Sequence, residues 1–286
     1  MAPLTRTELR HRLEHSSDGT KHVVDLVGLP AHVQGPRSLY WTVRGRTDLA
    51  PPPVLDGFVT GLLLQVAVAG GELRVHGAMS RTGLLNAIRL LELRRATSPD
   101  RYRPLRIVPD AVIDLEPSDA AGPRSAVLAF SGGLDSTHAA IRHARLGGED
   151  ALDLKALMMV FGFDAPLHRP DVFERMLERA RPLAAALDLP LVAVETNSML
   201  LARSLWPQTA TPLAAVGLSL FWQTARHGIF GGGLPYGANF LPLGHQPLFD
   251  QCCSGDAFAL VTDAAGLLRA QKLAVIASEP VALSGL

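Results

Sequence analysis

The sequence predicts an α/β protein in which a parallel-sheet domain follows a small α+β domain. In the second half of the 286-residue chain, apolar runs of strand length alternate with helical patterns, which is typical of parallel strands joined by crossover helices. The first half shows a mixed pattern without this alternation. A polar segment at 114–124, with two prolines and a glycine, has the composition of a linker. We therefore divide the chain into domains at 1–120 and 121–286.

The N-terminal unit combines short strands with two helices. Apolar spacing at 55–69 predicts a helix that ends at Gly70 and Gly71, and 84–93 predicts a second helix whose end at Arg94 and Arg95 suits its dipole. The runs 23–27, 39–43 and 73–76 predict strands. None of these segments carries a chemical motif. We expect structural support, with substrate positioning or oligomerisation as alternatives.

The C-terminal unit shows a regular order of strands and helices. Strands are predicted at 126–130, 154–161, 191–194 and 228–230, and helices near 135–146, 170–188 and 212–226. Pro170 with Asp171 marks one helix start, and Thr211 before Pro212 predicts an N-cap. Ligands of parallel sheets collect outside the carboxyl ends of the strands. Motifs that directly follow a strand are therefore the first candidates for function.

Charge and cysteine content exclude several functional classes. The 27 Lys and Arg residues balance 27 Asp and Glu residues, whereas proteins that bind nucleic-acid phosphates usually carry a basic excess. The two cysteines, Cys252 and Cys253, form neither a disulfide framework nor a structural zinc site. No stretch reaches the roughly 18 apolar residues of a membrane span. We expect a cytoplasmic protein without nucleic-acid or membrane partners.

The strongest motif is the run SGGLDS at 131–136, between the first strand of the second domain and the following helix. Gly132 and Gly133 let the backbone approach a ligand closely, so that N–H groups face phosphate oxygens. The helix adds its positive N-terminus, and the hydroxyls of Ser131 and Ser136 add donors. A carboxylate there would repel bare phosphate, so Asp135 is interpreted as a ligand of Mg²⁺. The loop predicts a site for Mg²⁺ and a nucleotide.

This run resembles the SGGxDS pyrophosphate loop of the N-type ATP pyrophosphatases, whose fold is adenine nucleotide alpha hydrolase-like and Rossmann-like. The resemblance implies that ATP is cleaved to AMP and pyrophosphate, that AMP is placed on a carboxylate, amide or carbonyl oxygen, and that a nitrogen or sulfur nucleophile displaces it. It also implies two sets of ATP-binding residues, the loop Ser131, Gly132, Gly133, Leu134, Asp135 and Ser136, and the candidate adenine neighbours Ala129, Phe130, Met159 and Phe161. The second set equally suits ordinary core positions.

A weaker resemblance lies further along the chain. Pro247-Leu-Phe-Asp250, with Arg269 and Lys272 some twenty residues on, is similar in layout to the synthetase domain of asparagine synthetases. This implies a catalytic, phosphate-contacting Lys272, for which a solvated helix position is the alternative. Asp250 is a second candidate metal ligand or a helix cap. His245 is a candidate general base or hydrogen-bond donor, and the glycine-rich loop at 231–239 either wraps the substrate or is only mobile.

Together these features predict an ATP-dependent, AMP-forming ligase or amidotransferase, which we expect to act in specialised metabolism. Its cofactors would be ATP and Mg²⁺, and its partners a small-molecule acid and an amine or ammonia. The alternatives are a non-catalytic ATP-binding sensor or scaffold, and an RNA-modifying enzyme with the same loop. Homo-oligomerisation stays open.

Overall fold

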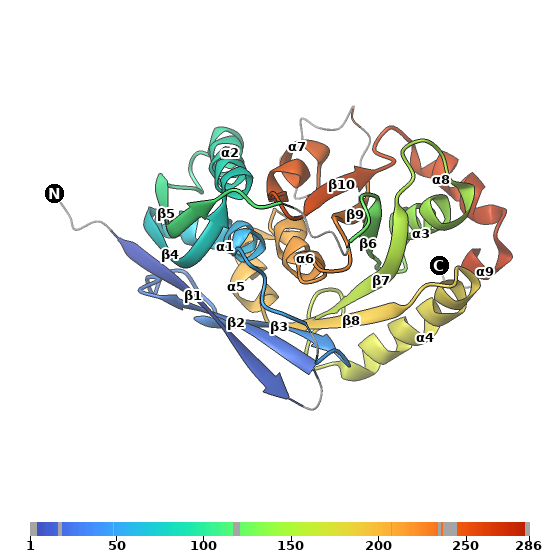
Figure 1. Cartoon of the computed structure of the whole chain (residues 1–286), viewed down its shortest axis with the longest axis horizontal. Coiled ribbons are helices and arrows are strands. Elements are labelled where there is room, and N and C mark those ends of the chain that lie inside the picture. Colours follow the sequence, from blue (N-terminus) through green and yellow to red (C-terminus); the bar gives the residue numbers. More distant parts are fainter. Residues whose placement is uncertain are drawn as a thin grey trace.

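A ten-stranded sheet forms the centre of the protein (Figure 1). The computed structural model describes residues 5–16, 19–47, 49–116, 121–206, 208–233, 236 and 245–283. Within these ranges the strand order is β10-β9-β6-β7-β8-β3-β2-β1-β4-β5, and neighbours are parallel except at β8–β3, β3–β2 and β2–β1. The strands are β1 (Arg6–Ser16), β2 (Gly19–Val27), β3 (Ser38–Arg44), β4 (Gly71–Ser80), β5 (Leu105–Ile113), β6 (Ser125–Ala129), β7 (Asp153–Phe161), β8 (Leu191–Thr196), β9 (His227–Gly231) and β10 (Ala259–Asp263).

Helices cover the sheet and connect its strands. The α-helices are α1 (Asp56–Ala69), α2 (Arg81–Thr97), α3 (Leu134–Ile141), α4 (Pro170–Ala186), α5 (Met199–Ala202), α6 (Ala210–Ser219), α7 (Pro247–Asp250), α8 (Arg269–Ala277) and α9 (Pro280–Leu283). The π-helix η1 (Arg142–Leu146) continues α3, and the 3₁₀ turns η2 (Arg203–Leu205) and η4 (Gln251–Cys253) follow α5 and α7. No helix within the described ranges is long and apolar enough to cross a membrane.

The C-terminal strands have the order of a Rossmann-like sheet. Across the sheet, these parallel strands have the order β8-β7-β6-β9-β10. Along the chain, β6 forms first in the middle, β7 and β8 are added on one side of it, and β9 and β10 are added on its other side. The order therefore reverses between β6 and β9, and in such sheets the crevice at this point binds ligands. The predicted α/β class with a mostly parallel sheet is confirmed.

The sequence located most of the longer elements correctly and missed seven strands and α-helices of the described chain. All seven predicted strands and all five predicted helices are present, with boundaries shifted by a few residues. The predicted N-cap Thr211 is wrong, because Thr209 precedes the helix and α6 begins at Ala210. The missed elements are the strands β1, β5 and β10, the helix α8 and the four-residue helices α5, α7 and α9.

Two hydrophobic layers pack on opposite faces of the sheet. Side chains of β6 alternate between them: Leu128 and Phe130 pack with the layer that includes α3 and α4, whereas Val127 and Ala129 pack with the layer that includes α1 and α6. The first half and the second half of the chain both contribute to this second layer. One core cluster is thus shared by residues from both predicted domains.

The two halves are joined through β3 and α1. β3 pairs antiparallel with β8, with Trp41 opposite Thr196, and α1 packs against α6 (Figure 1). The predicted domain boundary at 120 falls at residues 117–120, which lie outside the described residues. Across that boundary the sheet is continuous.

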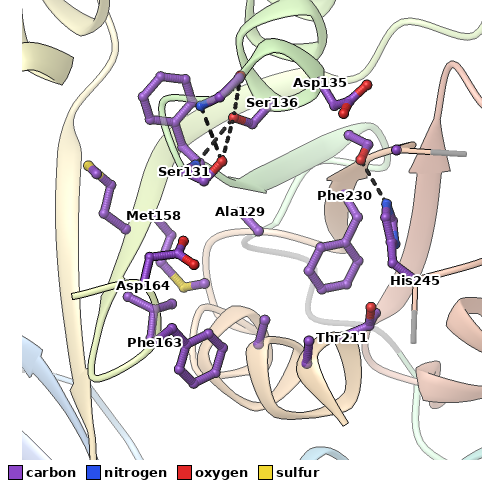
Figure 2. Close-up of a pocket in the computed structure, with 18 of the residues that line it drawn as sticks. Ala129, Ser131, Asp135, Ser136, Met158, Phe163, Asp164, Thr211, Phe230 and His245 are labelled. Atoms are coloured by element: carbon purple, nitrogen blue, oxygen red, sulfur yellow. Dashed lines mark hydrogen bonds between the residues drawn. The ribbon is translucent and has the colours of Figure 1, made fainter. Parts of the chain in front are cut away.

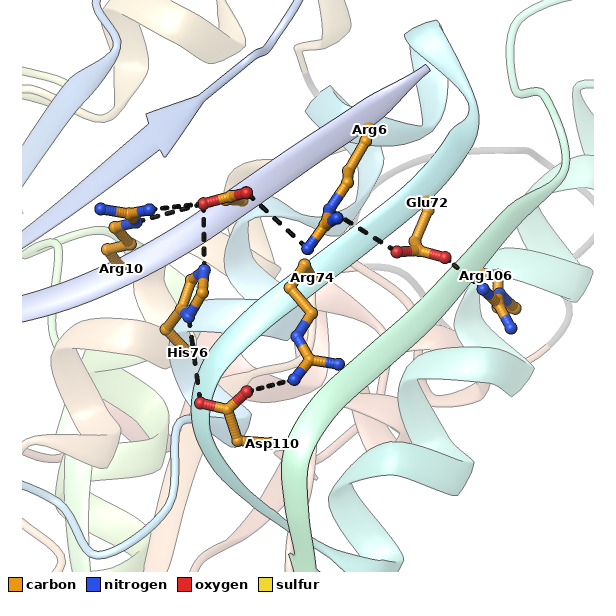
Figure 3. Close-up of polar contacts among 8 residues, drawn as sticks. Arg6, Arg10, Glu72, Arg74, His76, Arg106 and Asp110 are labelled. Carbon is orange, nitrogen blue, oxygen red and sulfur yellow. Dashed lines mark hydrogen bonds and ion pairs between the residues drawn. The ribbon is translucent and has the colours of Figure 1, made fainter. Parts of the chain in front are cut away.

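The sheet face formed by β1, β4 and β5 carries a ladder of ion pairs (Figure 3). Glu8 contacts Arg10 at 2.7 Å and His76 at 3.0 Å, and Arg74 contacts Asp110 at 2.6 Å. The neighbouring pairs join Glu72 with Arg6 and Arg106. Exposed pairs of this kind add little to stability. They explain why β1 lacks a continuous apolar run, since its charged residues alternate with buried Thr7 and Leu9.

Candidate functional site

The loop at 131–136 lies at the carboxyl end of β6, where the strand order reverses. Gly132 adopts a φ of 78°, which favours glycine. The loop is closed by its own serines: the Ser131 N–H donates to Ser136 Oγ at 3.2 Å, the Gly133 N–H donates to Ser131 Oγ at 3.2 Å, and Ser136 Oγ donates to the Gly133 carbonyl at 3.0 Å. Helix α3 then begins at Leu134. Its positive N-terminus is suited to an anion.

A cavity of about 580 Å³ opens beside this loop (Figure 2). Most of its wall is apolar, from the ends of β6 and β7 and from α6. Asp164 and Phe163, which follow β7, lie across the cavity from Asp135 and His245 (Figure 2). The predicted site residues that line it are Ala129, Phe130, Ser131, Gly133, Leu134, Asp135, Ser136, Met159 and His245. The cavity thus combines an apolar wall with a polar end at the loop.

Two of the predicted nucleotide-binding residues lie elsewhere. Phe161 is buried and stacks on Phe173 with ring centroids 4.9 Å apart, beneath the guanidinium of Arg44. It packs in the layer of α4 and does not line the cavity. Gly132 faces a second, smaller cavity on the other side of the loop. Phe161 is therefore a core residue, the alternative that its apolar strand left open.

Lys272 and Asp135 form a buried ion pair at the polar end of the cavity. Lys272, whose side chain is 1% exposed, places Nζ 2.9 Å from Asp135 Oδ1 and also donates to the Gly232 carbonyl. Arg269, one turn earlier on α8, contacts Asp135 Oδ2 at 3.1 Å and is largely exposed. Lys272 therefore lies beside the loop but is not among the residues that line the cavity, whereas Arg269 lies at the cavity rim.

His245 is held between a carboxylate and a carbonyl. Its Nε2–H donates to the Gly231 carbonyl at 2.7 Å, and Nδ1 lies 2.9 Å from Asp250 Oδ2. Burial alone would lower the pKa of His245, but the Asp250 carboxylate and the Gly231 carbonyl outweigh it, so the pKa is raised. Both ring nitrogens face acceptors, which is the environment of an imidazolium. The arrangement favours a donor over a general base.

Asp250 does not reach the cavity. Its side chain is 1% exposed, and it accepts hydrogen bonds from the Thr262 hydroxyl at 2.8 Å and from the Gln246 N–H at 3.3 Å. With His245 as its counter-ion, it is a poor fit for a metal that must also touch phosphates. Among the described residues no three His, Cys, Asp or Glu side chains converge on a metal position. Of the two predicted metal-binding carboxylates only Asp135 lines the cavity, and both of its oxygens are paired, Oδ1 with Lys272 and Oδ2 with Arg269.

The segment after β9 packs tightly on the loop. A Cβ at Gly231 would lie 2.4 Å from the Asp135 carbonyl, and one at Gly232 would lie 2.6 Å from the Asp263 carbonyl, so both positions need glycine. Of the glycine-rich loop predicted at 231–239, residues 234–235 and 237–239 lie outside the described residues. The described part connects the two predicted regions of the site, because it contacts Asp135, His245 and Lys272.

Several lining residues were not predicted as site residues. Met158 and Phe230 are strand residues, and Thr211 and Ala214 belong to α6. Asp164 follows β7 directly and has no hydrogen bond or ion pair within the described part of the chain. The rule that ligands collect after parallel strands would have identified Asp164. No comparable signal marks α6, because its wall residues are small or apolar.

Comparison of the chain with protein-family models, curated proteins and solved structures finds no match. The resemblance to the ATP pyrophosphatases therefore depends on the loop sequence at 131–136, together with its place after β6.

Proposed function

We propose that the protein is an ATP-dependent ligase that forms AMP and pyrophosphate. The observation that carries the proposal is the SGGLDS loop at the reversal of strand order, with Lys272 and Arg269 converging on it beside a cavity. A phosphate chain bound at the loop would meet the N-terminus of α3 and Arg269, with the buried Lys272 behind Asp135. The apolar wall at Ala129 and Met159 would hold the adenosine.

The reaction would proceed in two steps. An oxygen of a small carboxylate attacks the α-phosphorus, and the bond to the bridging oxygen of pyrophosphate breaks, with its electron pair leaving on pyrophosphate. An amine or ammonia then attacks the acyl carbon and AMP departs, which forms an amide or another C–N bond. Loop N–H groups and Lys272 stabilise the charge that develops on the leaving group.

Mg²⁺ would be held by Asp135 and would neutralise phosphate charge when bound. Arg269 is exposed, and among the described residues its one ion pair is with Asp135 Oδ2. Its side chain can therefore turn toward a bound phosphate. His245, whose pKa is raised by the Asp250 carboxylate, lines the same polar end of the cavity on the side of Asp135. We place the reaction in a reducing cytoplasm, with small molecules as partners.

Exchange of labelled pyrophosphate into ATP tests the proposal. We expect exchange with at least one acid from a panel of amino acids, aromatic acids and short aliphatic acids. Lys272→Met should reduce the exchange rate by about 100-fold or more, because one preorganised charge at a developing anion is lost. Lys155→Met, at an exposed lysine paired with Asp153, is the matched control and should leave the rate unchanged.

ATP binding is measured in parallel by calorimetry. Exchange that fails across the panel while ATP still binds would contradict adenylation and favour the sensor or scaffold. Exchange that depends on added tRNA would favour the RNA-modifying alternative. Circular dichroism of Lys272→Met separates a catalytic loss from unfolding, since removing one partner of a buried pair costs about 3–5 kcal/mol.

A further inference from the structure

Asp164 is an unpaired carboxylate on the wall of the larger cavity. It follows β7 and lines the cavity with an exposed side chain. Within the described part of the chain it has neither a hydrogen bond nor an ion pair. The other titratable residues among the described lining, Asp135, His245 and Arg269, all have ion-pair partners. Asp164 is therefore the lining residue whose charge the described part of the protein leaves unmatched.

The sheet places Asp164 at the opposite end of the cavity from the basic side chains. The strands β7 and β9 flank β6 on opposite sides, so the segments that follow them lie on opposite sides of the loop at 131–136. Figure 2 accordingly shows Asp164 across the cavity from Asp135 and His245. At the end of His245, the ion pairs join three basic side chains with two carboxylates. The cavity thus has a basic end and an acidic end.

The surroundings of Asp164 favour a cationic group of a ligand. Phe163 and Met158 lie on the same side of the cavity (Figure 2), and both pack in the layer that includes α1 and α6. An aromatic face attracts a cation within about 6 Å of the ring centroid. A ligand that fills the cavity displaces water from this apolar wall, which strengthens the attraction between opposite charges. Adenosine is uncharged and leaves the carboxylate unmatched, whereas an ammonium group matches it.

We propose that Asp164 binds an ammonium group of the substrate, so that the cavity selects an acid with an apolar body and an amino group remote from its carboxylate. This rests on the proposed function, in which the reacting carboxylate lies beside the α-phosphate at the loop. Such a substrate reaches from the basic end of the cavity, which suits its carboxylate, to the acidic end, which suits its ammonium group. Asp164 is then the residue that determines which substrate charge is accepted.

Binding of matched acids to the full chain tests the ammonium site. Each amino acid is compared with the acid that lacks its amino group: β-alanine with propionate, γ-aminobutyrate with butyrate, ε-aminocaproate with caproate, and para-aminomethylbenzoate with para-toluate. Dissociation constants are measured by NMR titration in the presence of Mg²⁺ and α,β-methylene-ATP, which is not cleaved between these phosphates. At least one amino acid should bind about tenfold or more tightly than its partner, because it gains a charge-assisted contact. Norleucine, the isomer of ε-aminocaproate whose amino group is beside the carboxylate, should bind no better than caproate.

Substitution of Asp164 assigns this preference to one side chain. Asp164→Asn keeps the shape and removes the charge, so it should abolish the preference, whereas Asp164→Glu should retain it. Asp100→Asn is the matched control, because Asp100 is exposed in the turn after α2 and does not line the cavity. A preference that survives in folded Asp164→Asn, or that is lost equally in Asp100→Asn, would overturn the proposal.

The full ligase reaction shows which substrate carries the ammonium group. If the nitrogen donor carries it, Asp164→Asn raises the KM for the amine about tenfold, and the paired acids bind alike. This result supports the ammonium site with the amine as its source. Paired acids that bind alike, together with an unchanged KM for the amine, would overturn the proposal.

The remaining outcomes separate this site from the proposed function. An Asp164-dependent preference in a protein that exchanges no pyrophosphate with any acid would contradict the proposed function and leave the ammonium site standing. Exchange at equal rates with both members of every pair, with no effect of Asp164→Asn on the amine, would overturn the site and leave the proposed function standing. A loss of ATP affinity in Asp164→Asn, measured by calorimetry, would assign the carboxylate to the ribose hydroxyls and overturn the proposal as well.

Discussion

Two side chains, His245 and Lys272, fix the backbone at the polar end of the site by donating hydrogen bonds to two consecutive carbonyl oxygens. His245 donates to Gly231 and Lys272 to Gly232, and each cation has its own carboxylate, Asp250 or Asp135. Charge-assisted hydrogen bonds are stronger than neutral ones. The segment after β9 is therefore fixed against the loop, and Asp250 acts on the site through His245.

The pairing of His245 makes stability depend on pH. Its pKa is raised in the folded protein, so the stabilisation is complete below the unfolded pKa of about 6.5 and is lost as the pH rises through the folded value. We expect the free energy of unfolding in urea to fall more for the wild type than for His245→Gln between about pH 6 and pH 9. Glutamine retains a neutral donor but does not titrate.

If the free energy of unfolding changed equally with pH in the wild type and in His245→Gln, the raised pKa of His245 would be contradicted. His138, whose pKa is lowered by burial despite the neighbouring Asp263, is common to both proteins and cancels in the difference.

At the scale of residues, the sequence located the loop, but three of its candidate site residues, Lys272, Asp250 and Phe161, do not line the cavity. The loop is local, so its glycines and serines reveal their role directly. Asp250 lies on a four-residue helix and accepts a hydrogen bond from Thr262. This contact depends on how the segments 245–250 and 259–263 pack together, which a local sequence pattern does not predict. Phe161 shares a strand with Met159, and only the packing of α4 separates the two.

Among the elements, α1 and α6 approach each other through glycines. A Cβ at Gly57 would lie 2.3 Å from Ser219 Oγ, and one at Gly61 would lie 2.3 Å from Val216 Cγ2. α6 in turn carries Thr211 and Ala214 on the cavity wall. Close packing of α1 therefore supports the wall from behind.

Gly61→Ala should destabilise the protein. Alanine favours the helix by about 1 kcal/mol, but overpacking against Val216 and the nearby Pro212 carbonyl costs about 1–3 kcal/mol. The difference is a net loss of up to about 2 kcal/mol in the free energy of unfolding, measured with urea. Gly266→Ala is the control, because nothing lies within 4 Å of its Cβ position. Equal stability of the two variants would contradict tight α1–α6 packing.

Most elements with apolar runs or helical spacing were predicted, with β10 and α8 as exceptions, whereas the strands β1 and β5 have no such pattern. β1 alternates charged and buried residues, and β5 is largely exposed at the sheet edge, so neither has an apolar run. The start of α6 was misplaced because Thr209 and Thr211 are equally good caps in sequence.

In the whole molecule, the N-terminal half extends the sheet of the Rossmann-like half and completes its core. β3 pairs with β8, and one hydrophobic cluster includes both α1 and α6. The sequence shows different patterns in the two halves, but it does not predict the antiparallel pairing of β3 with β8 that connects them. Neither strand has a local pattern that identifies the strand it pairs with. The helix α1 of the first half thus packs against α6, whose residues Thr211 and Ala214 line the cavity.

The central claim is cleavage of ATP between its α- and β-phosphates. Phosphorus NMR of the protein with Mg·ATP, the acid panel and ammonia identifies the products directly. The proposal predicts AMP and pyrophosphate in equal amounts, formed only when an accepted acid is present and lost in Lys272→Met. ADP with inorganic phosphate, or AMP formed at the same rate without any acid, would contradict it.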